Sequence, residues 1–327
     1  MSILLAHGGG GVRMRRLVED LFLPAFGDEE LRKLDDSAVL GEIVFTTDAY
    51  VVKPLFFPGG NIGKLAVCGT VNDIAVMGAE PLYLSLAMII EEGFSEEELE
   101  RVSVSIGNTA EECGVRIVAG DTKVVERGKG DGLYIISAGI GQLRVPHRLS
   151  LDTIKPGDKI IINGGIGLHG VAVLIARGEL GLSSKVESDC AGLWGLIEPL
   201  LSLGVRFMRD ATRGGVGGVL TEIADGRNWG IKVFENKLPV PMEVRGVCEV
   251  LGFEPLYLAN EGKVCVVVEN GKEEDVLASM RSHPLGKDAV VIGEVVEDYP
   301  GKVVVETSFG THRILEPPMG ELLPRIC

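Results

Sequence analysis

Apolar runs of strand length alternate with helix-like segments along this chain, and the alternation occurs in two sets. The first set has strand-like runs at 42–52, 81–90, 115–120 and 133–143, with helical segments around 61–78 and 95–112. After VPHRLSLDTIKPGDK (145–159), the pattern restarts with strands at 159–164, 263–269, 289–295 and 302–308, the segment VRFMRD, and helices near 168–178, 192–203 and from about 214. Two such sets predict a two-domain α/β (α+β) protein with a boundary near residue 150.

Length and composition agree with this fold class. A chain of 327 residues can bury two separate cores. Its 45 glycines follow no collagen-like period, so they predict many tight turns between strands and helices. The net charge of −15 argues against a nucleic-acid-binding surface and leaves carboxylates available for metal ions. We therefore expect small molecules or proteins as partners, and no nucleic acid.

The sequence predicts a cytoplasmic protein without membrane contact. Its N-terminus lacks a cationic region followed by a long apolar one, and the apolar stretch near 82–90 is too short to span a bilayer. Six cysteines form no Cys-x-x-Cys pair, so neither a zinc site nor a thioredoxin-like dithiol is indicated. Five of them lie in apolar or helical contexts, where buried, inert thiols are usual. The exception is Cys327, the last residue.

The end of the chain is predicted to be a loose tail. Residues 311–327, THRILEPPMGELLPRIC, have no apolar period and contain three prolines that interrupt regular structure. In extended form such a tail reaches roughly 50 Å, enough to carry Cys327 into a distant pocket or onto another protein. A frayed terminus without a role is the alternative. The predicted layout is thus an N-terminal domain (1–149), a C-terminal domain (150–310) and a flexible tail (311–327).

Five short motifs combine an aspartate with small residues or threonine. They are LDDSAV (34–39), TTDAY (46–50), GTVNDIAVMGAEP (69–81), AGDTKVV (119–125) and RDATRGGVGG (209–218). One such aspartate by itself more often caps a helix or forms an Asx turn. Their recurrence favours a Mg²⁺ site, because this cation takes oxygen ligands and usually binds together with substrate phosphates.

The last of these motifs also predicts a phosphate-binding turn. It opens a helix, and Gly214 and Gly215 let a bound group approach the backbone N–H groups at the helix N-terminus. The alternative is a glycine-rich turn that is needed only for close helix packing.

Two other glycine-rich stretches resemble nucleotide-binding motifs. GGNIGKL (59–65) fails as a P-loop because Pro58 stands at the first glycine position and Leu65 replaces the Mg²⁺-binding hydroxyl. GIGLHG (165–170) matches the dinucleotide fingerprint after a strand and before a helix, so a nicotinamide-dependent oxidoreductase is a rival hypothesis. Glu187 and Asp189 lie at a plausible distance for the ribose contact of such a motif. The position of the motif in mid-chain argues against the hypothesis, and the next strand ends at neither of these acids.

Lys123 and Glu261 are candidates for proton transfer. Lys123 follows the strand-like run at 115–120, and Glu261 lies in the polar break LANEGK between apolar runs. A surface ion pair of small energetic value is the default role for such residues. In a phosphate-rich pocket they would instead transfer protons.

Taken together, the aspartate motifs and the terminal PRIC resemble the HypE family of hydrogenase maturation proteins over essentially the whole chain. The aspartate motifs by themselves indicate only the wider ATP-using superfamily of selenophosphate synthetase and aminoimidazole ribonucleotide synthetase. Another synthetase of that superfamily therefore remains an alternative. The resemblance implies a two-domain homodimer whose N-terminal sheets pair, with ATP and Mg²⁺ bound between subunits and domains.

The resemblance also implies a reaction. A partner carbamoyltransferase, HypF, places a carboxamide on the terminal cysteine, here Cys327. ATP-dependent dehydration converts it to a thiocyanate, and the cyanide passes to iron on the HypC–HypD scaffold. The implied roles are Mg²⁺ binding by Asp36, Asp48, Asp73 and Asp210, positioning and deprotonation of the thiocarboxamide by Lys123 and Glu261, and nucleotide or metal contacts by Asp36, Thr47, Asn72, Asp121, Thr122, Asn163, Gly214 and Gly215.

Overall fold

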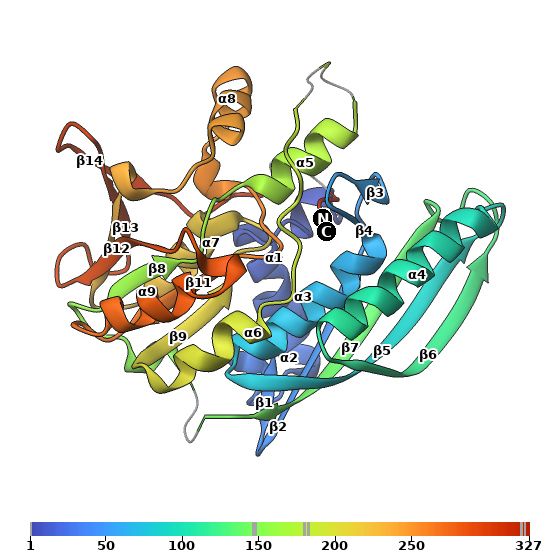
Figure 1. Ribbon diagram of the computed structural model, residues 1–327, viewed down its shortest axis with the longest axis horizontal. Coiled ribbons are helices and arrows are strands. Elements are labelled where there is room, and N and C mark those ends of the chain that lie inside the picture. Colours follow the sequence, from blue (N-terminus) through green and yellow to red (C-terminus); the bar gives the residue numbers. More distant parts are fainter. Residues whose placement is uncertain (1, 146–148, 179–180, 182–183, 321–322, 324) are drawn as a thin grey trace.

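The structure is a computed structural model that describes residues 2–145, 149–178, 181, 184–320, 323 and 325–327. Two β-sheets organise it, one from each half of the chain. Figure 1 shows the two sheets on opposite sides of the central helix α3 (Ile62–Val76). The mixed α/β class is confirmed.

The N-terminal sheet has five strands in the order β1-β2-β7-β5-β6. Only the β5–β6 pair is parallel, and the other neighbours are antiparallel. A two-stranded ribbon, β3–β4, stands apart from this sheet. The bounds are β1 Ala38–Leu40, β2 Ile43–Tyr50, β3 Phe56–Phe57, β4 Gly60–Asn61, β5 Ala79–Glu91, β6 Arg116–Val125 and β7 Leu133–Leu143.

Helix α3 packs tightly between the two halves of the molecule. Almost all of its residues are buried, as expected for a helix that is apolar all round. Two glycines of β7 allow it to approach the sheet: a Cβ on Gly139 or Gly141 would lie 2.7 or 2.3 Å from atoms of Ile74. Helix α4 (Glu96–Glu112) packs beside α3. Its sequence start SEEE (95–98) predicts a capping box of Ser95 and Glu98, and the Ser95 side chain indeed caps the helix by accepting from the Glu98 N–H.

The C-terminal sheet has seven strands in the order β14-β13-β10-β12-β8-β11-β9. Its strands are β8 Lys159–Ile162, β9 Val205–Asp210, β10 Gly230–Phe234, β11 Val264–Val268, β12 Val290–Val296, β13 Val303–Glu306 and β14 His312–Leu315. Strand β8, which precedes GIGLHG, lies between two antiparallel neighbours, β11 and β12. A dinucleotide site requires a parallel strand–helix–strand unit, so the oxidoreductase alternative is wrong.

Both faces of the C-terminal sheet are covered. Ile160 and Ile162 of β8 pack toward α7, whereas Ile161 packs toward α9 and toward the end of α3. The helices of this half are α5 Leu168–Ala176, α6 Trp194–Ile197, α7 Gly215–Ala224, α8 Met242–Leu251 and α9 Glu273–Arg281. The helix predicted over 192–203 divides into α6 and a 3-10 turn that contains a proline, Glu198–Ser202. Further short 3-10 turns are Leu151–Thr153, Glu235–Lys237, Pro255–Tyr257 and Pro284–Gly286.

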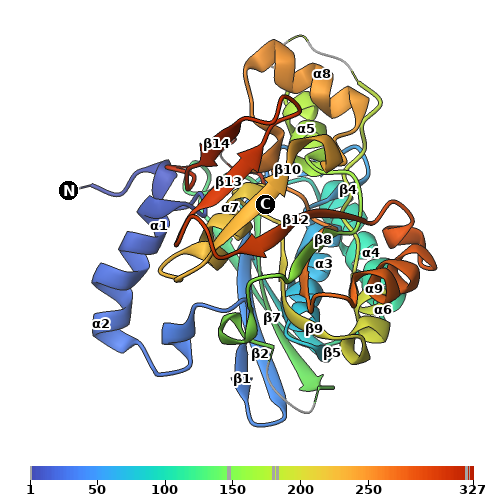
Figure 2. The same ribbon diagram turned by 90° about the vertical axis from the view of Figure 1, so that its left-hand side faces the viewer.

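Residues 5–33 form a helical arm that the sequence pattern did not reveal. It extends to one side of the molecule in Figure 2, where α1 and α2 are drawn in dark blue. Its elements are Leu5–His7, α1 Val12–Leu17, a π-helical turn Val18–Phe22, α2 Leu23–Phe26 and Leu31–Lys33. Within the described part of the chain, no helix is long and apolar enough to cross a membrane.

The tail is more structured than expected. Residues 312–315 form β14, which pairs with β13, so the prediction that regular structure ends before residue 311 is wrong. The short hairpin explains this, because Thr307 N–H donates to the Thr311 carbonyl and turns the chain back. Residues 321, 322 and 324 lie outside the described residues, and Cys327 is buried at the end of the chain.

Candidate active site

Five carboxylates from separate elements gather between the two domains. We call Asp36, Asp48, Asp73, Asp210 and Glu261 the acidic cluster. They come from the segment before β1, from β2, from α3, from the end of β9 and from the loop before β11. Their mutual electrostatic effects show that the chain brings together the four predicted metal ligands and one predicted catalytic residue.

Short polar contacts position Asp73. The Thr46 hydroxyl of β2 donates to Asp73 Oδ2 at 2.8 Å and also lies 3.1 Å from the Asp36 carbonyl. The Ser37 hydroxyl donates to the Asp73 carbonyl at 2.8 Å. Strand β2 and the segment before β1 are thereby tied to α3.

Arg209 of β9 joins the two domains at the edge of this cluster. Its Nε lies 3.1 Å from Asp36 Oδ1, and its two terminal nitrogens donate to the Glu222 carboxylate and the Leu34 carbonyl, each at 2.8 Å. Neighbouring carboxylates raise the pKa of Arg209, so it remains charged despite its burial. Arg209 therefore fixes the segment that carries Asp36 against the C-terminal domain.

The cluster holds more negative charge than its protein neighbours neutralise. Burial, followed by repulsion from the other carboxylates, raises the pKa of Asp73, Asp210 and Glu261 well above ordinary values. Burial also raises the pKa of Asp36, although Arg209 opposes the change. A site of this kind favours a bound cation.

Two atoms of the acidic cluster also indicate that it is suited to a bound cation. Asp210 Oδ2 and Glu261 Oε1 are buried without a hydrogen-bond partner among the described residues, and such groups are costly unless something satisfies them. The described side chains do not by themselves form a group of three or more histidine, cysteine or acidic ligands placed to hold a metal. This combination suits Mg²⁺, which completes its coordination with water and substrate phosphates.

The predicted phosphate-binding turn lies at the start of α7. Gly214 and Gly215 both have positive φ angles, 79° and 62°. A Cβ on Gly215 would lie 2.5 Å from the carbonyl oxygens of Leu256 and Leu258, so close packing explains this glycine. Gly214 has more room, because its nearest neighbour would be the Pro318 ring at 3.4 Å. Of these two glycines, Gly214 is the one with packing room for an approaching ligand.

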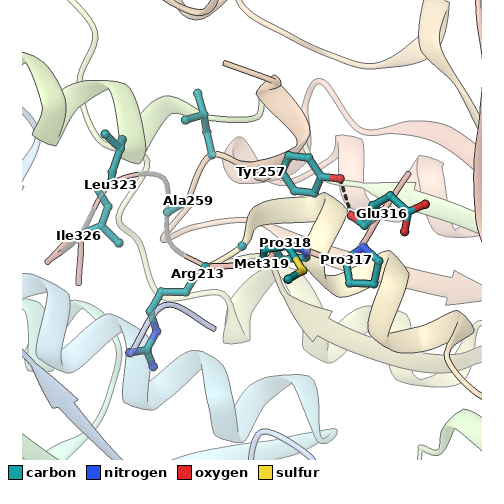
Figure 3. Close-up of a pocket in the computed structure, with 12 residues that line it drawn as sticks. Arg213, Tyr257, Ala259, Glu316, Pro317, Pro318, Met319, Leu323 and Ile326 are labelled. Atoms are coloured by element: carbon teal, nitrogen blue, oxygen red, sulfur yellow. Dashed lines mark hydrogen bonds between the residues drawn. The ribbon is translucent and has the colours of Figure 1, made fainter. Parts of the chain in front are cut away.

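A cavity of about 260 Å³ opens beside Gly214 (Figure 3). Tyr257 forms one wall and donates its hydroxyl to the Glu316 carbonyl at 2.5 Å. Pro318, another lining residue, is held by the Val12 N–H, which donates to its carbonyl. The other lining residues are Arg213, Leu258, Ala259, Pro317, Met319, Gly320, Leu323 and Ile326. The cavity is therefore lined both by Gly214 of the predicted phosphate-binding turn and by Leu323 and Ile326 near the end of the chain.

The end of the chain is docked in the core rather than extended into solvent. The Cys327 carbonyl accepts from Val51 N–H at 3.2 Å, and the Arg325 carbonyl accepts from Lys53 N–H at 3.1 Å. The Ile326 carbonyl lies 2.7 Å from His169 Nε2. We call Val51, Lys53 and His169, together with Arg325–Cys327, the tail dock.

Three predicted residues lie away from the acidic cluster. Asp121, Thr122 and Lys123 are on β6, which is exposed along nearly its whole length and forms the outer edge of the N-terminal sheet in Figure 1. Lys123 Nζ pairs with Asp121 Oδ2 at 2.7 Å, and the Thr122 N–H donates to Asp121. Among the described residues, Lys123 therefore forms the surface ion pair that the default hypothesis predicts, but with Asp121 rather than with Glu261.

Two predicted asparagines support Glu261. The Asn72 amide donates to the carbonyls of Ala191 and Glu261, and its oxygen accepts from Leu193 N–H. The Asn163 amide is likewise engaged with the backbone on both sides of Lys263. In this structure both side chains hold the loop before β11.

The remaining predicted contact residue faces the other side of β2. Thr47 is exposed, and its hydroxyl donates to the Ser137 carbonyl at 2.9 Å. It lies on the face of β2 opposite to Thr46, because successive side chains of a strand point to opposite sides. Thr47 is therefore not part of the acidic cluster within this chain.

The sequence patterns missed several residues of the site. Arg209, His169 and Lys263 were not singled out, and Asp189 was considered only as a ribose contact of the rejected dinucleotide motif. In the structure Asp189 and Lys263 form a buried pair, 2.9 Å apart. Attraction to Lys263 lowers the pKa of Asp189 despite burial, which is opposite to the shift of its neighbour Glu261. The motif GIGLHG contained a signal for His169. A polar side chain in an apolar helix start, between Gly167 and Gly170, needs a hydrogen-bond partner.

Comparison with known proteins agrees with the two-domain arrangement. Family models for the AIR synthase related protein match residues 34–143 (N-terminal domain) and 155–306 (C-terminal domain). The "Carbamoyl dehydratase HypE" of Escherichia coli (strain K12) is 47% identical over 100% of this chain and 99% of its own length. A chain from a crystal structure of a HypE–HypF complex is 51% identical, with a TM-score of 0.89, and the match covers 92% of this chain and 99% of that one. A crystal structure of HypE in complex with ATP is 44% identical, covers both chains fully and has a TM-score of 0.83.

Proposed function

Because the chain belongs to the HypE family of hydrogenase maturation proteins, we propose that it dehydrates a carboxamide on its own Cys327 to a thiocyanate, using ATP. The product supplies the cyanide ligand for the iron of a NiFe hydrogenase. The observation that carries this proposal is the tail dock, in which Cys327 is buried in the same apolar cluster as Leu258 and Ala259 of the loop that carries Glu261. A terminal cysteine without a role would have no reason to be held there.

The reaction balances without an external oxidant or reductant. The thiocarbamate RS–C(=O)NH₂ and ATP give RS–C≡N, ADP, phosphate and a proton. The amide oxygen attacks the γ-phosphorus after the nitrogen loses a proton, and loss of the second proton expels that oxygen as phosphate. Two deprotonations are therefore required at a site that excludes water.

Glu261 is the base in this scheme. Its pKa is raised well above the ordinary value by burial and by neighbouring carboxylates, which makes its ionised form a stronger base. Asn72 and Asp189 hold its backbone on either side, at 3.4 Å from its carbonyl and 3.1 Å from its N–H. The unpaired Oε1 atom is available to accept a proton from the amide nitrogen.

Mg²⁺ would be held by Asp36, Asp48, Asp73 and Asp210 together with the nucleotide phosphates, and it would neutralise charge that develops on the β- and γ-oxygens. Asp210 Oδ2, buried and unpaired, is the side-chain atom that most clearly lacks a partner without it. The backbone N–H groups after Gly214 would receive a phosphate at the start of α7.

Lys123 acts across a subunit boundary in this proposal, because its side chain is exposed on β6. The outer face of the N-terminal sheet carries exposed apolar residues, including Phe45, Tyr83 and Ile140, which a second copy of the chain would cover. We infer a homodimer that pairs through these sheets and completes each site with the partner's lysine. The other partners are a HypF carbamoyltransferase, which loads the tail, and a HypC–HypD scaffold, which receives the cyanide.

Intact-protein mass spectrometry tests the function. Purified chain incubated with the HypF partner, carbamoyl phosphate and ATP is expected to gain a carboxamide on the C-terminal peptide. It should then lose one water in a step that needs ATP and stops when Mg²⁺ is removed after loading.

Cys327→Ser is the control, because a hydroxyl has no accessible anionic form near neutral pH. It should bind ATP and fold normally but remain unloaded. A loaded Cys327→Ser chain, or a wild-type chain that never loses water under MgATP, would refute the proposal.

A further inference from the structure

The motif GIGLHG, which is not a dinucleotide site, has a different role in the structure. Gly167 adopts a left-handed conformation (φ 81°) at the start of α5, and its N–H donates to the Asn260 side chain at 2.7 Å. Two residues later, His169 is fully buried. The turn therefore delivers one imidazole ring into the core, between the C-terminal domain and the end of the chain.

The hydrogen bonds of His169 determine its tautomer. The Ile326 carbonyl can only accept, so Nε2 carries the proton and donates to it over 2.7 Å. The other nitrogen, Nδ1, is then an acceptor and lies 2.8 Å from the Ser188 hydroxyl, which must donate. The Ser188 oxygen in turn accepts from the Cys190 N–H at 3.1 Å. With a neutral ring, each hydrogen bond in this series has one possible direction. Burial lowers the pKa of His169, which favours the neutral ring.

The same loop reaches the proposed base. Next to Ser188, the Asp189 side chain accepts from the Glu261 N–H at 3.1 Å. Two residues further, the Ala191 N–H donates to the Glu261 carbonyl at 3.3 Å. A continuous series of contacts thus runs from the Ile326 carbonyl through His169 and this loop to the backbone of Glu261.

His169 differs from the other contacts in the tail dock. Val51 and Lys53 bind the tail through their backbone N–H groups, as any added strand would be bound. Arg325 forms a partly exposed ion pair with Asp131, a contact of small expected value, and its carbonyl also accepts from the side chain of the partly buried Arg177 at 3.0 Å. His169 is a buried side chain, and Phe57 fixes its ring by an edge contact with centroids 5.2 Å apart.

We propose that His169 is a positioning residue that holds the tail in the docked state and sets the position of Cys327 relative to Glu261. The inference rests on the proposed function for its link to catalysis, but not for the docking itself. The tail must leave the dock for loading by the partner and return for dehydration. The hydrogen bond between His169 and the Ile326 carbonyl exists only in the docked state. Loss of this hydrogen bond therefore shifts the equilibrium toward the undocked tail.

The test compares His169→Phe, which keeps a ring but has no donor, with His169→Gln, whose amide nitrogen can reach the Nε2 position. The first readout is alkylation of Cys327 by iodoacetamide under native conditions, measured on the C-terminal peptide. We expect labelling to rise about tenfold in His169→Phe and to return toward wild type in His169→Gln. The second readout is single-turnover dehydration of preloaded chain, which should slow in His169→Phe with the KM for ATP unchanged.

The chain provides matched controls. Cys248, buried on α8 beside α5, reports general loosening of the fold in the same digest. His283→Phe removes another histidine that makes one side-chain contact to the backbone, the acceptance of the Leu285 N–H at 3.2 Å. We expect neither Cys248 labelling in His169→Phe nor Cys327 labelling in His283→Phe to change.

Three results would overturn the inference. They are unchanged Cys327 labelling in folded His169→Phe, an equal rise at Cys248, and dehydration at the wild-type rate. If His169→Phe does not fold, His169→Asn replaces it, because its shorter amide cannot reach Ile326 while His169→Gln can. Wild-type chain that is labelled as expected but never dehydrates Cys327 would refute the proposed function and leave the docking role supported.

Discussion

The acidic cluster and the tail dock lie close together but differ in whether the chain itself satisfies their buried polar groups. In the cluster, buried carboxylates repel one another, and two of their oxygens have no hydrogen-bond partner among the described residues. In the tail dock, the carbonyls of the last three residues all accept hydrogen bonds. One region is incomplete as it stands, whereas the other is completed by the chain's own end.

The difference indicates what each region binds. Unsatisfied negative charge is costly unless a cation or phosphate-bound metal joins it, so the cluster is suited to an external ligand. The tail dock already holds its ligand through backbone donors and the side chains of His169 and Arg177, and it can release that ligand at modest cost. In the proposed function, the molecule therefore pairs an acidic cluster that binds MgATP with a tail dock that opens and closes around Cys327.

The largest expected effect separates chemistry from docking. Glu261→Gln removes the base while keeping the size of the side chain, so dehydration of loaded chain should fall at least about a hundredfold. Carbamoyl loading should be unchanged, because it needs only the thiol. Single-turnover mass spectrometry measures both steps, and the exposed Glu243→Gln on α8 is the matched control. Dehydration at the parental rate in Glu261→Gln would remove Glu261 from the mechanism.

Subunit mixing tests whether the cluster is completed by a partner. Lys123→Ala and Glu261→Gln chains should each be inactive in dehydration. If each site combines the lysine of one subunit with the glutamate of the other, a random mixture of dimers should recover about one quarter of wild-type activity, and purified mixed dimers about one half. Co-expression with two affinity tags provides the mixed species. No recovery in purified mixed dimers would place both residues in one chain or exclude Lys123.

A pH experiment tests the repulsion within the cluster. The folded-state pKa of Asp73 lies well above the ordinary value of 3.8, so the folded metal-free protein binds that proton more tightly than the unfolded chain does. Its ionisation therefore lowers stability as pH rises from the ordinary value through the raised one. Metal-free Asp73→Asn should exceed wild type in free energy of unfolding by on the order of 1 kcal/mol at pH 8.

This advantage should shrink at acidic pH, because the folded wild-type protein takes up a proton on Asp73 as the pH falls through the raised pKa. Urea denaturation at the two pH values measures the change. MgATP should reverse the order, because Asp73→Asn loses a ligand of the proposed metal. An advantage that stays constant with pH, or ATP affinity that is unchanged across Mg²⁺ concentrations, would contradict the assignment of Asp73.

The smallest effect is expected at the edge of the tail dock. Asp131 pairs with both Arg325 and Lys53, and these contacts lower its pKa, but the group is largely exposed. Asp131→Asn should raise Cys327 alkylation by no more than about threefold. A tenfold rise, equal to that expected for His169→Phe, would mean that the ion pair and not the histidine holds the tail.

Much of the local structure was predictable because its signals are local. The strand predicted over 133–143 coincides with β7, and the Ser95 cap correctly marked the start of α4. The aspartate motifs grouped Asp73 and Asp210, which are far apart in sequence, and the structure places the two carboxylates close enough for Asp210 to raise the pKa of Asp73. Their role as metal ligands stays a prediction. In each case the pattern consists of neighbouring residues whose backbone preferences agree with the fold.

The sequence by itself determined the two-set α/β pattern, the acidic motifs and the isolated thiol at the end. Only the tertiary structure decided that β6 carries Lys123 away from Glu261, that His169 meets Ile326, and that the tail ends in a buried dock. The last two facts depend on contacts between residues more than a hundred positions apart. Whether a polar group such as Glu261 is buried, and which partner it then finds, follows from how helices and sheets pack, because local propensity carries no information about that environment.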